Sequence, residues 1–548
     1  MPSIAGFLLE HADDAGTALL FEDQAWGWPA FAAGCAARAA YLTERLPVGE
    51  PPHIGVLLDN TPEFALWLGA AALARASIVG VNPTRRGDEL ARDVRHTRCG
   101  LLVTEERHAP SLDGLDLGLA PGGLVRIDSP EWRELLAPYD GAAMPSGDVD
   151  PATQLLLLFT SGTSGRPKAV VCSQGRLAGI GAAVAGMFAL TPADVCYIAM
   201  PMFHSMALMS GFAPALAVGA TLALRRRFSA SGFLPDVRRF GATYANYVGK
   251  PLSHVLATPV RDDDADNPLR VVFGNEGAEA DLVRFGERFG CRVVDGYGST
   301  EGGANVSRAT GQPPGSFGVL TDALGVRDPE TGAPCPVARF GANGTLANAA
   351  EAVGELVSSA GPSTFEGYWD DPGATSARLR DGLYWTGDLV YSDDAGFLYF
   401  AGRSDDWLRV DGENLAAAPV ERVLARHPEV VVAAVYAVPD VVTGDQLVAA
   451  LQLAPGVAFD PAGFTDFLVA QADLGTTWVP RFVRVGEVPV TASGKVLKRS
   501  LRAARWGGSA QLWWREGRGP AAPYRLMSAA ERDRLEAEVA ARAPNRVS

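Results

Sequence analysis

A loop rich in hydroxyl groups and glycines follows the apolar stretch at residues 155–159 and ends on Lys168. Its positions are Thr160, Ser161, Gly162, Thr163, Ser164 and Gly165. Glycines let backbone N–H groups approach a polyphosphate, hydroxyls donate further hydrogen bonds, and the lysine offsets negative charge. The chain has only four lysines, at 168, 250, 495 and 498, so a lysine here favours a phosphate site over a flexible surface loop. The loop is not a Walker A motif, because the adjacent Gly-Lys-Ser/Thr is missing.

A second glycine-rich segment, residues 295–303, contains an aromatic ring, a hydroxyl and a carboxylate in quick succession. Tyr297 could stack on a nucleotide base, and Glu301 could hold Mg²⁺. Glu301 stands where the dinucleotide fingerprint requires its third glycine, so hydride-transfer chemistry is disfavoured. Taken alone, the segment could be a simple turn.

Two later positions add polar chemistry. Asp388, in the segment 384–388, can accept hydrogen bonds from two ribose hydroxyls. Lys495 closes the glycine-bearing segment 489–495 and can reach an anion from another domain. Each of them could equally lie in a solvated turn.

The elements that must position these residues alternate between helix and strand. His53–Leu58 is a predicted strand, and a helix with Pro62 in its first turn follows it. The rhythm continues to Gly296, after which Gly- and Pro-rich turns separate shorter strands and indicate a β-rich subdomain. We place the main domain boundary near Gly402.

The two predicted domains cover residues 1–401 and 402–548. In the second, helices near 419–426 and 461–470 and a strand at 430–438 predict a small α+β domain. Its end, residues 507–548, is a C-terminal extension that contains an Arg- and Glu-rich helix at 528–541.

Composition bounds the class of protein. The 548 residues are too many for one core, and 47% hydrophobic with 20% charged residues is typical of a globular chain. A formal net charge of −15 argues against a nucleic-acid or anionic-membrane surface. The six cysteines are scattered, so neither a disulfide framework nor a zinc site is indicated, and a cytoplasmic location is expected.

Two apolar stretches could be mistaken for targeting or membrane segments. Residues 1–14 lack a basic region and predict an amphipathic first helix rather than a signal peptide. Residues 205–224 carry no charge but are only weakly apolar, so they predict a buried helix, a turn at Gly219 and a strand at 220–224. No integral membrane association is expected.

Together and in this order, the segments resemble those of the adenylate-forming enzymes, which include acyl-CoA synthetases, luciferases and peptide-synthetase adenylation domains. The resemblance covers about residues 50 to 500. Within the family, segments 246–249, 274–277 and 411–415 look closer to fatty-acid transport proteins and very-long-chain acyl-CoA synthetases. The resemblance implies two doubly wound α/β subdomains and a β-rich subdomain, followed by a small mobile α+β domain.

The resemblance also implies a role for individual residues. It assigns the phosphates of ATP to 160–168, the adenylate phosphate to Thr300, and Mg²⁺ to Glu301. Adenine is assigned to Gly277, Ala278, Asp295, Gly296 and Tyr297, and the ribose to Asp388 and Arg403. Lys495 would bridge the attacking carboxylate and the α-phosphate, Asp405 would be the interdomain hinge, and Gly412 would let the pantetheine of coenzyme A pass.

The acyl pocket is less readable. His204, in the segment 201–204, matches the position that lines the pocket near the reacting carboxylate. Further pocket candidates are Met202, Met206, Met209, Phe212, Tyr247 and Gly249, and Lys250 could contact CoA or substrate. Methionine suits irregular apolar ligands, but an ordinary helix core explains the methionines equally well.

The implied activity is an ATP- and Mg²⁺-dependent ligase that joins a hydrophobic carboxylic acid to coenzyme A. An adenylating enzyme that loads a carrier protein stays open, as does a chain specialised for one half-reaction. A nucleotide sensor is disfavoured by the presence of both Glu301 and Lys495, and a serine hydrolase by the lack of a Gly-x-Ser-x-Gly segment. The identity of the acid stays open: it could be a fatty acid, a polyketide-derived acid or a terpenoid-derived acid. A homodimeric assembly also stays open.

Overall fold

The computed structural model describes most of the chain. The residues outside the description are 1, 146, 161–166, 307, 309–310, 342–345, 404–406, 411–412, 440–444, 472–473, 475–477, 492–495, 509, 517–520 and 543–548.

The first sheet has six strands in the order β6-β5-β3-β4-β7-β8. They are β3 (His53–Leu57), β4 (Ser77–Gly80), β5 (Leu101–Thr104), β6 (Leu124–Arg126), β7 (Gln154–Thr160) and β8 (Lys168–Ser173). All neighbours are parallel except the hairpin of β7 and β8. Strands β3, β4 and β5 are buried along their whole length, as expected where both faces of a parallel sheet are covered.

The second sheet has seven strands in the order β13-β12-β11-β9-β10-β1-β2. They are β1 (Thr17–Phe21), β2 (Gln24–Gly27), β9 (Val195–Ile198), β10 (Thr221–Leu224), β11 (Tyr244–Val248), β12 (Val271–Asn275) and β13 (Arg292–Asp295). All neighbours are parallel except β1 and β2. The carboxyl ends of the parallel strands therefore meet at one edge, where α/β folds place ligands.

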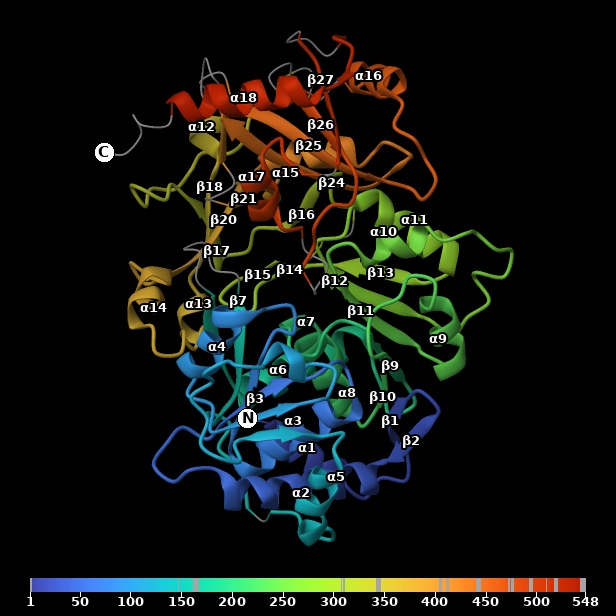
Figure 1. Cartoon of the computed structure of the whole chain (residues 1–548), viewed down its shortest axis with the longest axis vertical. Coiled ribbons are helices and arrows are strands. Elements are labelled where there is room, and N and C mark those ends of the chain that lie inside the picture. Colours follow the sequence, from blue (N-terminus) through green and yellow to red (C-terminus); the bar gives the residue numbers. More distant parts are fainter. Residues whose placement is uncertain are drawn as a thin grey trace.

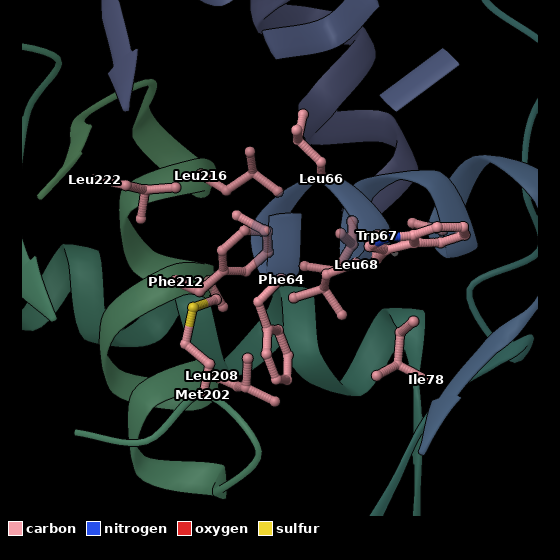
Figure 2. Close-up of a cluster of buried hydrophobic side chains, with 14 of the residues drawn as sticks. Phe64, Leu66, Trp67, Leu68, Ile78, Met202, Leu208, Phe212, Leu216 and Leu222 are labelled. Atoms are coloured by element: carbon pink, nitrogen blue, oxygen red, sulfur yellow. The ribbon is translucent and has the colours of Figure 1, made fainter. Parts of the chain in front are cut away.

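The helices that pack against these two sheets share one large hydrophobic core, part of which Figure 2 shows. They include α1 (Ile4–His11), α2 (Trp28–Arg45), α3 (Pro62–Ala74), α6 (Gln174–Phe188) and α8 (Ala213–Val218). Helix α3 is buried from Phe64 to Leu73, because it packs on every side. Gly69 lets α2 approach it, since a Cβ there would lie 2.5 Å from Cys35 Sγ.

The uncharged segment 205–224 folds as predicted, with one addition. Helices α7 (Ser205–Ala207) and α8 are joined by a π-helical turn at Leu208–Phe212, which the sequence did not predict. Gly219 ends α8 with a positive φ of 68° before β10. None of the helices in the described part of the chain is both long and apolar enough to cross a membrane.

The β-rich subdomain is an antiparallel sheet in the order β16-β21-β20-β18-β17, with β19 beside β20. Its strands are β16 (Ser316–Val319), β17 (Leu324–Arg327), β18 (Gly354–Ser358), β19 (Leu379–Arg380), β20 (Leu383–Ser392) and β21 (Phe397–Arg403). The short pair β14 (Tyr297–Gly298) and β15 (Asn305–Val306) precedes it.

The last part of the chain forms a mixed sheet in the order β23-β22-β25-β26-β27-β28, with β24 beside β25. The strands are β22 (Trp407–Val410), β23 (Glu413–Ala416), β24 (Val430–Pro439), β25 (Asp445–Leu453), β26 (Phe482–Val485), β27 (Gln511–Trp514) and β28 (Arg525–Leu526). Its helices are α15 (Ala417–Leu424), α16 (Pro461–Val469), α17 (Lys498–Ala504) and α18 (Ala529–Arg542). Figure 1 shows this part, in orange and red, at the opposite end of the molecule from α1 and α2.

The predicted fold class is confirmed: two α/β sheets, a β-rich sheet and a smaller α+β unit occur in the predicted order. The predicted domain boundary near Gly402 falls at the end of β21. The division into 1–401 and 402–548 stays a prediction.

Candidate active site

Asp295 ends β13 and lies at the edge of the second sheet, beside the turn that follows β12. Its Oδ2 accepts hydrogen bonds from the Tyr247 hydroxyl at 2.5 Å and from the Gly277 N–H at 2.9 Å. Burial raises the pKa of Asp295 to about 6. A Cβ at Gly277 would lie 2.7 Å from the Tyr247 hydroxyl, so only glycine fits. Ala278 follows as the N-cap of α11 (Glu279–Phe289), and three predicted adenine contacts are therefore neighbours.

Tyr297 and Asp388 are joined across two sheets. The Tyr297 hydroxyl donates to Asp388 Oδ2 at 2.5 Å, and its ring lies 5.2 Å from that of Phe317. Burial and the nearby Asp388 carboxylate raise the pKa of Tyr297, so its hydroxyl stays a donor. Asp388 in β20 pairs in register with Arg403 in β21. The predicted base and ribose residues therefore lie together.

Glu301 is buried beside the mouth of the predicted phosphate loop. Its Oε1 accepts hydrogen bonds from the Tyr368 hydroxyl at 2.9 Å and the Thr160 hydroxyl at 3.5 Å. Thr160 pairs with Lys168 at the loop end of the β7–β8 hairpin. The Lys168 ammonium lies 5.2 Å from the centre of the Tyr368 ring. Tyr368, which the sequence reasoning missed, thus contacts both charged groups.

Thr300 connects the predicted adenylate segment to the predicted acyl segment. Its hydroxyl is hydrogen-bonded to that of Ser205 at 2.9 Å, and its carbonyl accepts from Arg176 Nη2 at 2.6 Å. Ser205 follows His204, whose Nδ1 accepts from the Met206 N–H at 3.3 Å. Arg176 was also missed, because one arginine among 44 gives no signal in the sequence.

Asn60 fixes the segment that carries His204. Its Nδ2 donates to the Met200 carbonyl at 2.8 Å, and its Oδ1 accepts from the Met202 N–H at 2.8 Å. The side chain is 3% exposed. Gly80 lies against the same segment, since a Cβ there would be 2.7 Å from the Phe203 carbonyl oxygen. Asn60 was missed in the sequence, because its partners lie 140 and 142 residues further along the chain.

The acyl-pocket candidates separate into two groups. Met202 and Phe212 are fully buried in the large core near Phe64, which agrees with the helix-core alternative (Figure 2). Met206 and Met209 belong to the same core and are 9% and 8% exposed.

Tyr247 and Gly249 lie on and after β11. Tyr247 points its hydroxyl to Asp295, on the predicted adenine side, instead of toward the methionines. Gly249 has a φ of +75°, which favours glycine, and its N–H donates to the Asn275 carbonyl at 3.0 Å. Lys250 follows as the N-cap of α10 (Pro251–Leu256).

Side chains of β11 hold the π-helical turn in place. The Tyr244 hydroxyl donates to the Ser210 carbonyl at 2.7 Å, and Asn246 Nδ2 donates to the Met206 carbonyl at 2.9 Å. These bonds satisfy carbonyls that regular α-helix geometry would pair internally. The two bonds therefore fix the backbone at Met206 in α7 and at Ser210, next to Met209 in the turn.

One buried cluster has ligand types that metals use. It consists of Asp59, Glu105 and His108, with candidate ligand atoms within 4.8 Å of one another. Arg107 and Arg227 contact Asp59 at 2.6 and 3.1 Å, and Arg226 contacts Glu105 at 2.8 Å. Because guanidinium groups already balance both carboxylates, the cluster is an ion network and does not suit a cation.

Several predicted residues lie outside the described part of the chain. They are Ser161, Gly162, Thr163, Ser164, Gly165, Asp405, Gly412 and Lys495. Their roles stay predictions.

Comparison with known proteins shows the family of the chain. The AMP-binding enzyme family matches residues 11–369, and the AMP-binding enzyme C-terminal domain matches residues 419–495. A medium/long-chain-fatty-acid–CoA ligase, FadD17, of Mycobacterium marinum is 49% identical over 503 residues, covering 92% of this chain and 96% of the relative. A steroid-22-oyl-CoA synthetase of Rhodococcus jostii is 47% identical over 540 residues, covering 98% and 97%.

Solved structures share the fold at low identity. The anthranilate–CoA ligase AuaEII in complex with anthranoyl-AMP has a TM-score of 0.78 at 20% identity, covering 92% of this chain and 97% of that one. ATP-bound MatB from Rhodopseudomonas palustris has a TM-score of 0.76 at 22% identity, covering 92% and 98%.

The fold and the two family matches define the class of adenylate-forming enzymes. The chain belongs to the AMP-binding enzyme family and is an AMP-forming acid–thiol ligase, an ATP-binding acyl-CoA synthetase.

Proposed function

We propose that this acyl-CoA synthetase activates a hydrophobic carboxylic acid, either a medium- or long-chain fatty acid or a bulky acid such as a steroid side-chain acid. The observation that carries the proposal is the 2.9 Å contact between the Ser205 and Thr300 hydroxyls. It brings the segment of His204 to the segment of Glu301. An acid held at His204 would then lie beside the α-phosphate of ATP held at Thr300, and proximity of this kind lowers the barrier to reaction.

Each predicted site residue keeps its proposed role. Residues 160–165 and Lys168 hold the phosphates of ATP. Gly277, Ala278, Asp295, Gly296 and Tyr297 hold adenine, and Asp388 with Arg403 holds the ribose. The contact of Tyr297 with Asp388 supports this arrangement, because one bond links the base-binding and ribose-binding groups.

We propose Mg²⁺ as the cofactor and Glu301 as its protein ligand. Mg²⁺ is typically held by one or two carboxylates together with substrate phosphates, and a buried carboxylate beside the phosphate loop fits that pattern. When bound, the ion would neutralise charge on the phosphates. Glu301 would orient the phosphate chain through it, while Lys168 would neutralise charge from the other side.

The chemistry then runs in two half-reactions. A carboxylate oxygen of the acid attacks the α-phosphorus of ATP, the bond to pyrophosphate breaks, and acyl-AMP forms. Lys495 is proposed to lie between the two anions, where a cation is worth most in a water-poor site. The thiol of coenzyme A then attacks the acyl carbonyl, loses its proton, and releases AMP.

The second half-reaction requires the lysine loop to leave. We propose that residues 402–548, including the extension 507–548, rotate about Asp405 relative to residues 1–401, and that pantetheine passes Gly412. Domain movements of this kind commonly separate steps of catalysis.

The residues that line the acyl pocket bear on which carboxylic acid the enzyme activates. Met206 and Met209, at the edge of the core, offer an adaptable apolar lining, and Tyr247, Gly249 and Lys250 stay candidates for the acyl and CoA paths. FadD17 and steroid-22-oyl-CoA synthetase are named for acids of very different shape. A closer resemblance to fatty-acid transport proteins and very-long-chain synthetases stays a proposal that rests on segments 246–249, 274–277 and 411–415.

The location of the protein in the cell and its oligomeric state are also matters of proposal. A cytoplasmic location is supported by six cysteines that are all free thiols. A homodimer stays open, as does specialisation for one half-reaction.

The test is a ligation screen with ATP, Mg²⁺ and coenzyme A over medium- and long-chain fatty acids and a steroid-22-oic acid, read by mass spectrometry. We expect acyl-CoA from at least one of these hydrophobic classes and none from acetate or benzoate. Preference for a short or aromatic acid would contradict the proposal.

A further inference from the structure

Tyr368 contacts both of the charged groups that are proposed to bind phosphate and magnesium. It follows Gly367, which has a φ of +92°, and it forms an isolated antiparallel bridge with Val170 in β8. The side chain is only 6% exposed. The inference below rests on the proposed roles of Lys168 and Glu301.

The two ends of the tyrosine serve different partners. The ring offers its face to the Lys168 ammonium at 5.2 Å, an attraction that leaves the ammonium N–H groups available for a phosphate. The hydroxyl donates to Glu301 Oε1 at 2.9 Å. That bond orients the carboxylate without neutralising its charge.

Arg378 also contacts the hydroxyl end of the tyrosine. Its Nε donates to the Tyr368 hydroxyl at 3.4 Å, and its Nη1 donates to the Trp385 carbonyl at 3.1 Å. Tyr368 therefore has one defined orientation.

A lysine ammonium and a glutamate carboxylate that come into contact attract each other. An ammonium and a carboxylate at about 4 Å gain roughly 4 kcal/mol near a protein surface. Among the described residues, Lys168 and Glu301 form no ion pair with each other. If they paired directly, ATP and a cation would have to break that pair before binding, and the site would lose affinity for both.

We infer that Tyr368 is a positioning residue that acts as a neutral spacer. It gives Lys168 a ring and Glu301 a hydroxyl, and so keeps the two charges apart and open to ATP and Mg²⁺.

The experiment measures equilibrium ATP binding by calorimetry with and without Mg²⁺, and Mg²⁺ titrations of binding at fixed ATP. Tyr368→Phe keeps the ring and loses the hydroxyl. We expect the Mg²⁺ concentration that gives half of the maximal increase in ATP binding to rise about fivefold. The dissociation constant for ATP without Mg²⁺ should change less than twofold. Tyr368→Leu removes the spacer, and ATP binding should weaken about tenfold in both conditions.

A double variant separates a spacer from a simple structural role. In the Tyr368→Leu background, Glu301→Gln removes the charge that would capture Lys168. Mg²⁺-free ATP binding should then recover to within about twofold of the wild-type protein. No recovery would overturn the inference, as would a Tyr368→Phe titration that matches the wild type. If Tyr368→Leu does not fold, the Phe titration decides alone.

Three control variants keep the outcomes distinct. Tyr436→Phe removes a buried hydroxyl that donates to the Arg505 carbonyl at 3.2 Å, outside the site, and it should leave both titrations unchanged. Glu301→Gln and Lys168→Ala test the proposed roles themselves. If these two leave Mg²⁺ and ATP binding unchanged, the proposed function of the site is wrong. If Glu301→Gln and Lys168→Ala weaken Mg²⁺ and ATP binding but Tyr368→Phe does not, only the inference that Tyr368 is a spacer is wrong.

Discussion

At the scale of single residues, Asn60 links two sheets through one amide. It pairs with the backbone of Met200 and Met202, as a neighbouring strand would. Asn60→Ala leaves a buried carbonyl and a buried N–H unpaired, which costs about 1–3 kcal/mol for each group. Because the segment carries His204, kcat/KM for the acid should fall about tenfold or more, while the dissociation constant for ATP stays within about twofold.

Asn348 provides a matched control. Its Oδ1 accepts from the Arg339 N–H at 2.7 Å and its Nδ2 donates to the Val337 carbonyl at 3.0 Å, in the β-rich subdomain. Asn348→Ala should lower the melting temperature by a comparable amount and leave kcat/KM for the acid unchanged. Equal losses of activity in both variants would show that Asn60 acts only through stability.

Asp295 predicts a pH effect on stability. Burial raises its folded-state pKa to about 6, above the ordinary value near 4. The folded protein therefore holds this proton more tightly, and the stability it contributes is complete below about pH 4 and lost as the pH rises through about 6.

Asp295→Asn removes that titration and keeps an oxygen for Tyr247 and Gly277. The gain in unfolding free energy relative to the wild type should be about 1–2 kcal/mol larger at pH 7.5 than at pH 5. Urea titrations at both pH values check this. A gain that is the same at both would contradict the raised pKa.

At the scale of elements, the sequence predicted most of the helices, strands and turns that apolar periodicity and helix-ending residues indicate. The strand after Pro52, the turn at Gly219 and the strand β24 all lie where they were predicted, because alternating or continuous apolar residues and a helix-ending glycine are local signals. The π-helical turn at 208–212 was not predictable, because it depends on Tyr244 and Asn246 from a later strand.

The residues of the candidate site also fall into those that the sequence predicted and those that it did not. Motif residues such as Asp295, Thr300 and Glu301 were predicted as site residues because their types and order are distinctive. Tyr368 and Asn60 were missed because their importance lies in long-range contacts, and an isolated tyrosine or asparagine gives no signal of these in one sequence.

The π-helical turn itself can be tested at Gly211. A Cβ there would lie 2.7 Å from Asn246 Nδ2 and 3.0 Å from Ile198 Cγ1. Gly211→Ala should displace the Asn246 amide and with it Met206, so KM for the acid should rise about fivefold or more while KM for ATP holds. Gly186→Ala, in α6 with open space around it, should change neither. A change in KM for ATP alone would contradict the assignment of this turn to the acyl side.

At the scale of the whole molecule, the two half-reactions require two positions of the C-terminal part. A proline at the proposed hinge fixes φ and restricts the residue before it. Asp405→Pro should therefore slow conversion of a supplied acyl-AMP to thioester by about tenfold or more, and slow acid-dependent pyrophosphate release much less. Rapid-quench measurement of each half-reaction checks this. Equal slowing of both would remove Asp405 as the hinge.

The central claim is that the acid passes through an acyl-adenylate held by this chain. The most direct measurement incubates the enzyme with a hydrophobic acid, ATP and Mg²⁺ but no coenzyme A, and analyses the quenched mixture by mass spectrometry. Enzyme-bound acyl-AMP and an equal amount of pyrophosphate are predicted, and addition of coenzyme A should convert the adenylate to acyl-CoA and AMP. Formation of ADP and phosphate, or of acyl-CoA without any acyl-AMP that can chase into it, would contradict the account.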